Sequence, residues 1–76
     1  MVHAFVLVKT GVGASSGVID QLEAIEAVSE AHIVAGEYDL ILEVDADAVN
    51  DILSFVTSEI QLLEGVLDTK TYISLE

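Results

Sequence analysis

A glycine-centred interruption in the middle of the sequence is the feature that most restricts how this chain can fold. Residues 31–35 form an apolar run that ends at Gly36, and a second apolar run begins shortly after it. Two such runs joined by a glycine and a few polar residues are typical of a β-hairpin. Gly36 also removes the steric limit on the turn, because it has no Cβ. The sequence therefore predicts a hairpin whose tip carries Glu37, Tyr38 and Asp39.

Helical periodicity is strongest in the second half of the chain. Asp45 or Asp47 is suited to cap the start of this helix, and Gly65 is suited to follow its end as a C′ residue. Its apolar residues recur at helical spacing throughout, namely Val49, Ile52, Leu53, Val56, Ile60 and Leu63. An earlier amphipathic helix of about four turns is predicted with Ser15 or Ser16 as its N-cap. Its apolar stripe consists of Val18, Leu22, Ile25 and Val28.

Strands are predicted on either side of these helices. Residues 2–8 are apolar at both odd and even positions, which indicates a strand buried on both faces and central in its sheet. Residues 31–35 form the second strand, and residues 66–75 form the last. The third has Tyr38, Leu40, Leu42 and Val44 on one face. The order is βαββαβ, which predicts an α+β, ferredoxin-like fold: a four-stranded antiparallel sheet with two helices on one face.

This arrangement leaves one face of the sheet without helices. The chain has 76 residues, of which 53% are hydrophobic, and one small core cannot hide that much apolar material. Because the first strand is apolar on both faces, we expect two copies to bury their bare faces against each other. The expected homodimer is of the dimeric α+β-barrel type.

The charge of the chain restricts its partners. Fourteen acidic residues stand against two lysines and no arginine, giving a formal net charge of −12. Nucleic acid is excluded as a direct partner, because binding phosphates requires a basic patch. Acid-rich, lysine-poor surfaces also occur in proteins from a salt-loaded cytoplasm, so we expect a halophilic source, such as a halophilic archaeon.

Other protein classes are disfavoured by what the sequence lacks. Without cysteine, neither a disulfide framework nor a thiolate metal site can form. No apolar run reaches the length of about 18 residues that a membrane span needs. The amino terminus also lacks the basic start of a secretory signal. A soluble, cytoplasmic protein without a membrane partner is expected.

The sequence offers little support for a catalytic or a metal site. The loop at residues 11–17 is rich in glycine, but Ser16 stands where the dinucleotide fingerprint needs a glycine, and no lysine follows to make a P-loop. His3 and His32 have no third ligand at metal spacing, so we expect them to border the sheet or the dimer seam. No spacing ties a nucleophile to a base. We therefore predict no enzyme, metal or cofactor; an anion contact at the loop and a general-base histidine remain alternatives.

The hairpin tip and the last strand together form a candidate ligand site. A free amino acid carries an ammonium, for which Asp39 or Glu37 offers acceptors. Its carboxylate would use threonine hydroxyls and the backbone N–H groups that a glycine turn exposes. The candidate ligand-binding residues are Gly36, Glu37, Tyr38, Asp39, Thr69 and Thr71. The alternative is an ordinary turn beside ordinary strand residues.

Two motifs resemble one family of regulators. Residues 31–44 contain G-x-Y-D, and residues 65–73 contain G-V-x-x-T-x-T. Together they resemble the effector-binding half of the Lrp/AsnC transcription regulators, also called the RAM domain, over nearly the whole chain. The resemblance implies sheet-paired dimers that assemble into tetramers or octamers, with effectors, typically amino acids, bound between dimers. Position by position, Gly36, Tyr38 and Asp39 would form the hairpin part of that pocket, and Thr69 and Thr71 the strand part.

The resemblance also implies a mode of action. The regulators usually carry an amino-terminal helix-turn-helix that binds DNA, whereas this sequence begins directly with its first strand. We therefore expect a stand-alone sensor that responds to an amino acid or related metabolite and co-assembles with DNA-binding relatives.

Two other families share this element order. An ACT-like regulatory domain would bind its ligand at the loop of residues 11–17. A small dimeric α+β-barrel enzyme, of the monooxygenase or isomerase kind, would hold His3 or His32 in a roomy pocket between sheet and helices. The sensor hypothesis predicts a filled core and a cleft between subunits.

Overall fold

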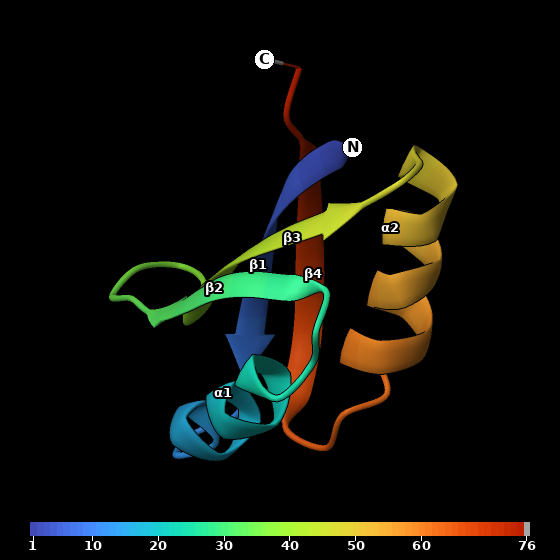
Figure 1. Ribbon diagram of the computed structural model, residues 1–76. Coiled ribbons are helices and arrows are strands. Elements are labelled where there is room, and N and C mark those ends of the chain that lie inside the picture. The colour runs from blue at the N-terminus through green and yellow to red at the C-terminus, as the bar shows by residue number, and fades with distance from the viewer. Residues whose placement is uncertain (76) are drawn as a thin grey trace.

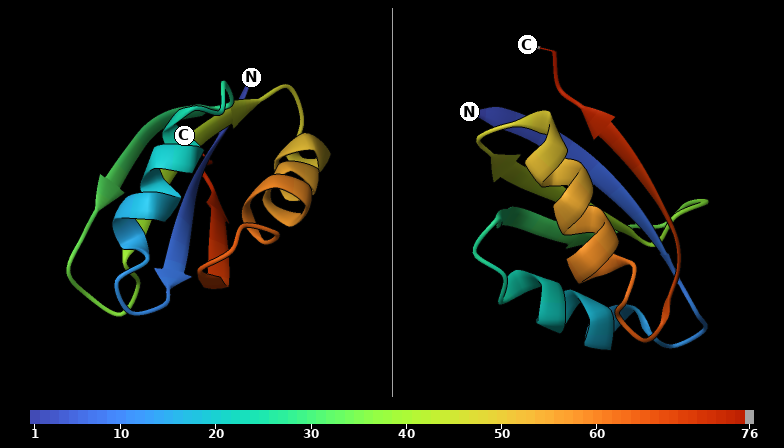
Figure 2. Two further views of the ribbon diagram at one scale, coloured as in Figure 1. Left: turned by 90° about the horizontal axis from the view of Figure 1, so that it is seen from below. Right: turned by 90° about the vertical axis from the view of Figure 1, so that its right-hand side faces the viewer.

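The predicted ferredoxin-like architecture is confirmed in the computed structural model, which describes residues 1–75. The elements are β1 (Val2–Thr10), α1 (Ser15–Glu23), β2 (Val28–Ile33), β3 (Leu40–Ala46), α2 (Val49–Phe55), η1 (Val56–Ile60) and β4 (Val66–Ile73) (Figure 1). The strands form one antiparallel sheet in the order β2-β3-β1-β4, so β1 is central as predicted. Both helices lie on the same side of this curved sheet (Figure 2).

Alternation along β1 separates the two faces of the sheet. Ala4, Val6 and Val8 are fully buried on the side that the helices cover. Val6 lies opposite Leu42 in β3 and Thr71 in β4, so these residues share the covered face. The odd-numbered residues of β1 point to the other side and are partly exposed. We call this side, which no helix covers, the open face.

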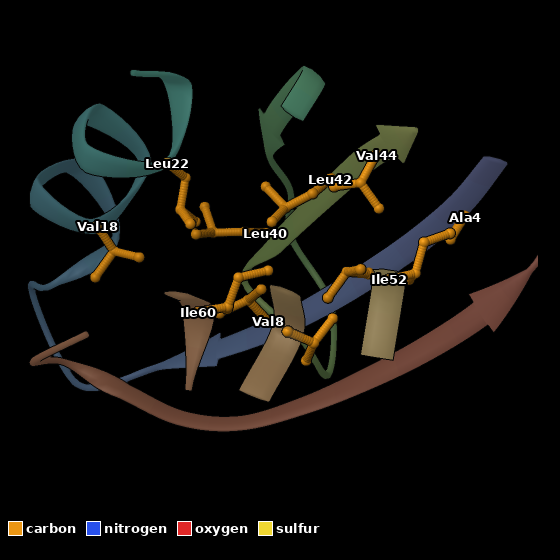
Figure 3. Close-up of a cluster of buried hydrophobic side chains, with 11 residues drawn as sticks. Ala4, Val8, Val18, Leu22, Leu40, Leu42, Val44, Ile52 and Ile60 are labelled. Atoms are coloured by element: carbon orange, nitrogen blue, oxygen red, sulfur yellow. The ribbon is translucent and has the colours of Figure 1, made fainter. Parts of the chain in front are cut away.

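The core fills the space between the sheet and the helices (Figure 3). Helix α1 contributes Val18 and Leu22, and α2 with η1 contributes Ile52, Val56 and Ile60. These five residues all belong to the predicted helical stripes. The sheet supplies the other buried hydrophobic residues, which are Ala4, Val6, Val8, Leu40, Leu42 and Val44. None of the helices within residues 1–75 combines the length and apolar character needed to cross a bilayer.

The first helix is shorter than predicted. It ends at Glu23, and β2 already begins at Val28, so the predicted start of this strand at residue 31 is also wrong. Between them, the N–H of Ile25 donates to Leu22 and the N–H of Val28 donates to Ile25, each at 3.0 Å. Apolar residues that recur every three positions therefore fit these successive tight turns as well as they fit a helix. Ile25 and Val28 still pack against the core.

Neither predicted helix cap is used. Helix α1 follows Ala14 without a side-chain cap, and the hydroxyl of Ser15 instead bonds that of Thr10 at 2.7 Å. Helix α2 likewise follows Ala48 without a side-chain cap, because Asp45 belongs to β3 and contacts His3. The predicted caps failed because these side chains have tertiary partners, or because the helices start a residue or two away from them.

The second helix ends earlier than its apolar stripe. Its final turn, η1, is π-helical, and its cap residue Gln61 donates its N–H to Val56 at 2.9 Å. The hydroxyls of Thr57 and Ser58 donate to carbonyls four residues earlier, a pattern that competes with regular helical bonding. Gly65 is therefore not the C′ residue. It adopts a φ of +98° four residues later, where a Cβ would lie only 3.1 Å from the Cβ of Ala14.

Candidate functional site

The hairpin is present, but its connection is a longer loop than predicted. Strand β2 ends at Ile33 and β3 begins at Leu40, so residues 34–39 form the loop and Tyr38 is not part of β3. Gly36 does not take a positive φ, unlike Gly13 and Gly65. The predicted hairpin is therefore present, but its six-residue loop closes without the conformational freedom that the sequence analysis assigned to Gly36.

Asp39 fastens this loop to the end of β1. Its Oδ2 accepts a hydrogen bond of 2.8 Å from the N–H of Thr10, a residue that is only 7% exposed. Its own N–H donates to the carbonyl of Val8 at 2.9 Å, and its carbonyl accepts from Val34 at 2.8 Å. The pairing of β1 with β3 ends at Val8, so the Thr10 N–H lies beyond that ladder and takes a side-chain partner. One carboxylate oxygen of Asp39 is thus already committed to the fold.

Tyr38 connects the same loop to β4. Its hydroxyl donates to Asp68 at 3.4 Å, and the Nζ of Lys70 lies 6.0 Å from the centre of its ring. Partial burial, followed by the charge of Asp68, raises the pKa of Tyr38, so the phenol is protonated and remains a donor at neutral pH. Lys9 adds a further contact by donating to the carbonyl of Glu37 at 3.1 Å.

The six predicted ligand-binding residues do not converge within one chain. Gly36, Glu37 and Tyr38 border a surface hollow of about 280 Å³, which Leu7 and Ile41 place on the open face. Thr69 borders another hollow of about 220 Å³ together with Gln61, whose amide donates to the threonine hydroxyl at 2.9 Å.

Both threonines belong to the covered side of the sheet. Thr71 lies opposite Val6, and Thr69 lies opposite Val8. The hairpin and strand halves of the predicted site therefore lie on opposite faces.

Asp68 is the residue that touches both halves, and sequence reasoning missed it. It accepts the bond from Tyr38, and it also lines the hollow of Thr69. The signal was available in the sequence, since Asp68 is the one carboxylate inside the G-V-x-x-T-x-T strand.

His3 lies between two carboxylates on the open face. Its Nδ1 is 2.5 Å from Oδ1 of Asp45, and its Nε2 is 2.9 Å from Oε1 of Glu43. These hydrogen bonds, that to Asp45 first, raise the pKa of His3, and the same contact lowers the pKa of Asp45. The imidazole also meets the ring of Phe5 edge-on at 5.2 Å between centroids.

His32 has neighbours that the sequence spacing does not reveal. Glu30, His32 and Glu43 bring ligand atoms within 4.8 Å of one another, because Glu30 lies opposite Glu43 across β2 and β3. The prediction that no third metal-ligating residue accompanies a histidine was therefore wrong, because the fold brings Glu30 and Glu43 next to His32. His32 already bonds Glu30 at 3.1 Å, and exposed carboxylates often gather without an ion, so proximity alone does not make this cluster a metal site.

Comparison of the sequence with known protein families identifies the family of this chain. Residues 3–76 match the family described as the Lrp/AsnC ligand binding domain. The chain belongs to the Lrp/AsnC ligand-binding family. An uncharacterised HTH-type transcriptional regulator of Pyrococcus horikoshii is 39% identical over 57 residues, which are 75% of this chain and 38% of that protein. This Lrp/AsnC domain thus spans about two fifths of the length of that relative.

Solved structures agree with the family assignment. The crystal structure of FFRP-DM1 is 39% identical, with a TM-score of 0.94, and the match covers 99% of this Lrp/AsnC domain and 100% of that chain. A Neisseria meningitidis structure, the transcriptional regulator NMB0573 in complex with L-Met, has a TM-score of 0.90 at 21% identity. That match covers 99% of this chain and 50% of the other, and at this identity it shows the fold alone.

Proposed function

We propose that this Lrp/AsnC domain binds an amino acid or a related small metabolite and regulates transcription by assembling with DNA-binding relatives, without catalysing a reaction. The match of residues 3–76 to the Lrp/AsnC ligand binding domain carries the proposal. The relative in Pyrococcus horikoshii is an HTH-type transcriptional regulator, and the Neisseria protein was crystallised with L-Met. The first supports a role in transcription regulation, and the second shows that a protein with this fold can be crystallised with an amino acid.

The ligand would sit at a seam between subunits. Small-molecule sites usually bury most of the ligand surface, whereas the hollow beside Gly36, Glu37 and Tyr38 is open and small at about 280 Å³. Because Thr69 and Thr71 lie on the opposite side of the sheet, the hairpin and strand halves would come from different subunits. Such a site needs at least two subunits, and assembly into a tetramer or an octamer would create further seams of this kind.

The polar groups of the loop suit a zwitterion. Glu37 and the uncommitted oxygen of Asp39 offer acceptors for an ammonium, and the phenol of Tyr38 offers a donor. Loop N–H groups and the hydroxyls of Thr69 and Thr71 would bind the carboxylate.

The filled core favours a sensor over a barrel enzyme. The enzyme hypothesis needs a histidine inside a pocket between sheet and helices, but eleven buried hydrophobic residues occupy that space. His3 and His32 both lie on the open face, paired with carboxylates.

Isothermal titration against the twenty amino acids, in molar KCl to suit a halophilic source, tests the proposal. Heat of binding is expected with at least one of them. Asp39→Asn keeps an acceptor for the Thr10 N–H but removes the charge, so it should weaken binding at least tenfold while the chain stays folded. Asp20→Asn on the exposed surface of α1 is the matched control. No heat with any amino acid, in an oligomer confirmed by sedimentation, would overturn the proposal.

A further inference from the structure

Two glutamates face each other directly across β2 and β3 on the open face. Glu30 lies opposite Glu43 in the register of this antiparallel pair, and His32 lies close to both. Like charges that are directly opposite each other destabilise a strand pair. The register of the sheet is therefore unfavourable at this point unless a cation lies between the two carboxylates.

The two lysines are segregated from these facing glutamates. Lys70 belongs to β4, the edge strand at the far side of the sheet from β2. Lys9 lies opposite Asp68 and donates to the carbonyl of Glu37 at 3.1 Å, so its charge is already placed beside other acidic residues. The sequence has no arginine. Within residues 1–75, the ion pairs of the facing glutamates are therefore made by histidines alone.

Both histidines of the chain lie at this cluster. The Nε2 of His32 is 3.1 Å from Oε1 of Glu30, and the Nε2 of His3 is 2.9 Å from Oε1 of Glu43. His3 also contacts Asp45 through Nδ1, so three carboxylates gather around two imidazoles. Even with both histidines protonated, one negative charge remains in excess. Because the chain has no cysteine, imidazole is the strongest transition-metal ligand that its side chains offer.

The ligand atoms are close enough to share one ion. Those of Glu30, His32 and Glu43 lie within 4.8 Å of one another. Atoms that bind one zinc ion at about 2.0–2.2 Å lie about 3–4 Å apart, so small side-chain rotations close the site. Glu30 and His32 have room for these rotations, since their side chains are 58% and 57% exposed. His3 holds one oxygen of Glu43, in the way that an outer hydrogen bond orients a metal ligand.

We propose that Glu30, His32 and Glu43 bind one divalent transition-metal ion such as Zn²⁺, with water completing its coordination. Three protein ligands and an open position are a common composition of zinc sites. A mixed nitrogen and oxygen set favours Zn²⁺ over Mg²⁺ and Ca²⁺, which prefer oxygen alone. The sequence prediction of no metal relied on spacing along the chain, whereas strand register brings these ligands together. The inference does not depend on amino-acid binding.

Such an ion would fasten an edge strand to its neighbour. Glu30 and His32 belong to β2, which is an edge strand with mostly exposed residues, and Glu43 belongs to β3. Strand β2 leads directly into the loop of residues 34–39, which carries the hairpin part of the candidate site. An ion that binds only the folded chain stabilises it by mass action. The Tm should therefore rise with the concentration of Zn²⁺.

Isothermal titration with Zn²⁺ tests the site. The chain is first freed of metal with EDTA and then exchanged into molar KCl, which screens the general attraction of cations to a net charge of −12. One ion should bind per chain, and Mg²⁺ should bind at least about tenfold more weakly. Thermal unfolding with and without Zn²⁺ should show the rise in Tm.

Ligand variants locate the ion. Glu30→Gln and His32→Ala each remove one proposed ligand, and each should weaken Zn²⁺ binding at least about tenfold. Glu23→Gln and Glu59→Gln are the matched controls, because each removes one exposed carboxylate from a helix and should leave the affinity unchanged. Circular dichroism should show that all four variants are folded.

Nuclear magnetic resonance of the wild type gives a second test, which holds even if a variant unfolds. The chain has only two histidines, so their ring signals are assigned from His3→Gln. Zn²⁺ should shift the ring nitrogens of His32 more than those of His3, because only His32 would bind the ion.

Three outcomes would overturn the inference. The first is no saturable binding of Zn²⁺, and the second is equal affinity for Zn²⁺ and Mg²⁺, which would indicate only general attraction to an acidic surface. The third is binding that Glu30→Gln and His32→Ala leave unchanged without a shift at His32. That result would place the ion elsewhere, such as the acidic hollow that includes Asp47 and Asp51.

Discussion

The covered and open faces of the sheet show how one strand serves two purposes. On the covered face, Ala4, Val6 and Val8 are buried by helices of the same chain. On the open face, His3, Phe5 and Lys9 alternate charge with apolar surface and stay partly exposed. Substitutions on the covered face should therefore change the free energy of unfolding strongly, whereas those on the open face should change it only slightly. Four substitutions test that division, from the largest expected effect to the smallest.

Truncation of a core side chain should have the largest effect. Leu22 is fully buried between α1 and the sheet, and Leu22→Ala leaves a cavity that should lower the free energy of unfolding by about 2–5 kcal/mol. Leu62 is 78% exposed, so Leu62→Ala is the matched control and should change stability by less than about 0.5 kcal/mol. Urea unfolding at several protein concentrations measures both. Equal effects would contradict the placement of the core.

Gly65→Ala should come next. Its φ of +98° and the short distances to Ala14 and Val18 leave no comfortable place for a Cβ. The strain should cost about 1–3 kcal/mol. Gly17→Ala is the control, since Gly17 lies in α1 with open space around it and alanine is the better helix former. Thermal unfolding should show a lower Tm for the first variant and an unchanged or higher Tm for the second.

Loss of the Asp39 anchor should have a moderate effect. Asp39→Ala leaves the N–H of the buried Thr10 without its acceptor, at a cost of about 1–3 kcal/mol. Asp39→Asn retains an oxygen for that bond and should be clearly more stable than the alanine variant. Chemical denaturation of the pair distinguishes a structural role of Asp39 from its proposed role in ligand binding. Identical stabilities would show that the bond contributes nothing.

The smallest change in stability is expected from removing the ion pairs of His3 on the open face, and this change depends on pH. The raised pKa of His3 means that its ion pairs stabilise the fold fully below the ordinary histidine value, and that this gain is lost as pH rises through the raised pKa. The lowered pKa of Asp45 sets the acid limit, because the gain is lost again as pH falls through that value. His3→Gln should therefore be less stable than the wild type below the ordinary histidine pKa, and the difference should shrink as pH rises through the raised pKa of His3. A difference that does not vary with pH would contradict the ion pairs.

Long-range features were predicted well where a repeated pattern encoded them. The two-sided apolar character of residues 2–8 placed β1 in the centre, and the apolar stripes named the core residues of both helices. Element ends were predicted poorly. Residues 25–28 satisfy a helical spacing while forming turns, and Ser15 and Asp45 bond tertiary partners instead of capping helices.

The candidate site was predictable only in part. The loop motif led to Asp39 and Tyr38, but their partners Thr10 and Asp68 depend on strand register, which a single sequence does not specify. The same limit hid the contact between Glu30 and Glu43, which are far apart in sequence and adjacent across two strands.

The segregation of the lysines has a practical consequence. Apart from the amino terminus, an amine-selective reagent finds only Lys9 and Lys70, and both report on the same corner of the sheet. Acetylation followed by peptide mass spectrometry is therefore a footprint of that corner without any engineered label. Slower modification at high protein concentration would map the buried surface directly, in dilute solution or in a cell extract.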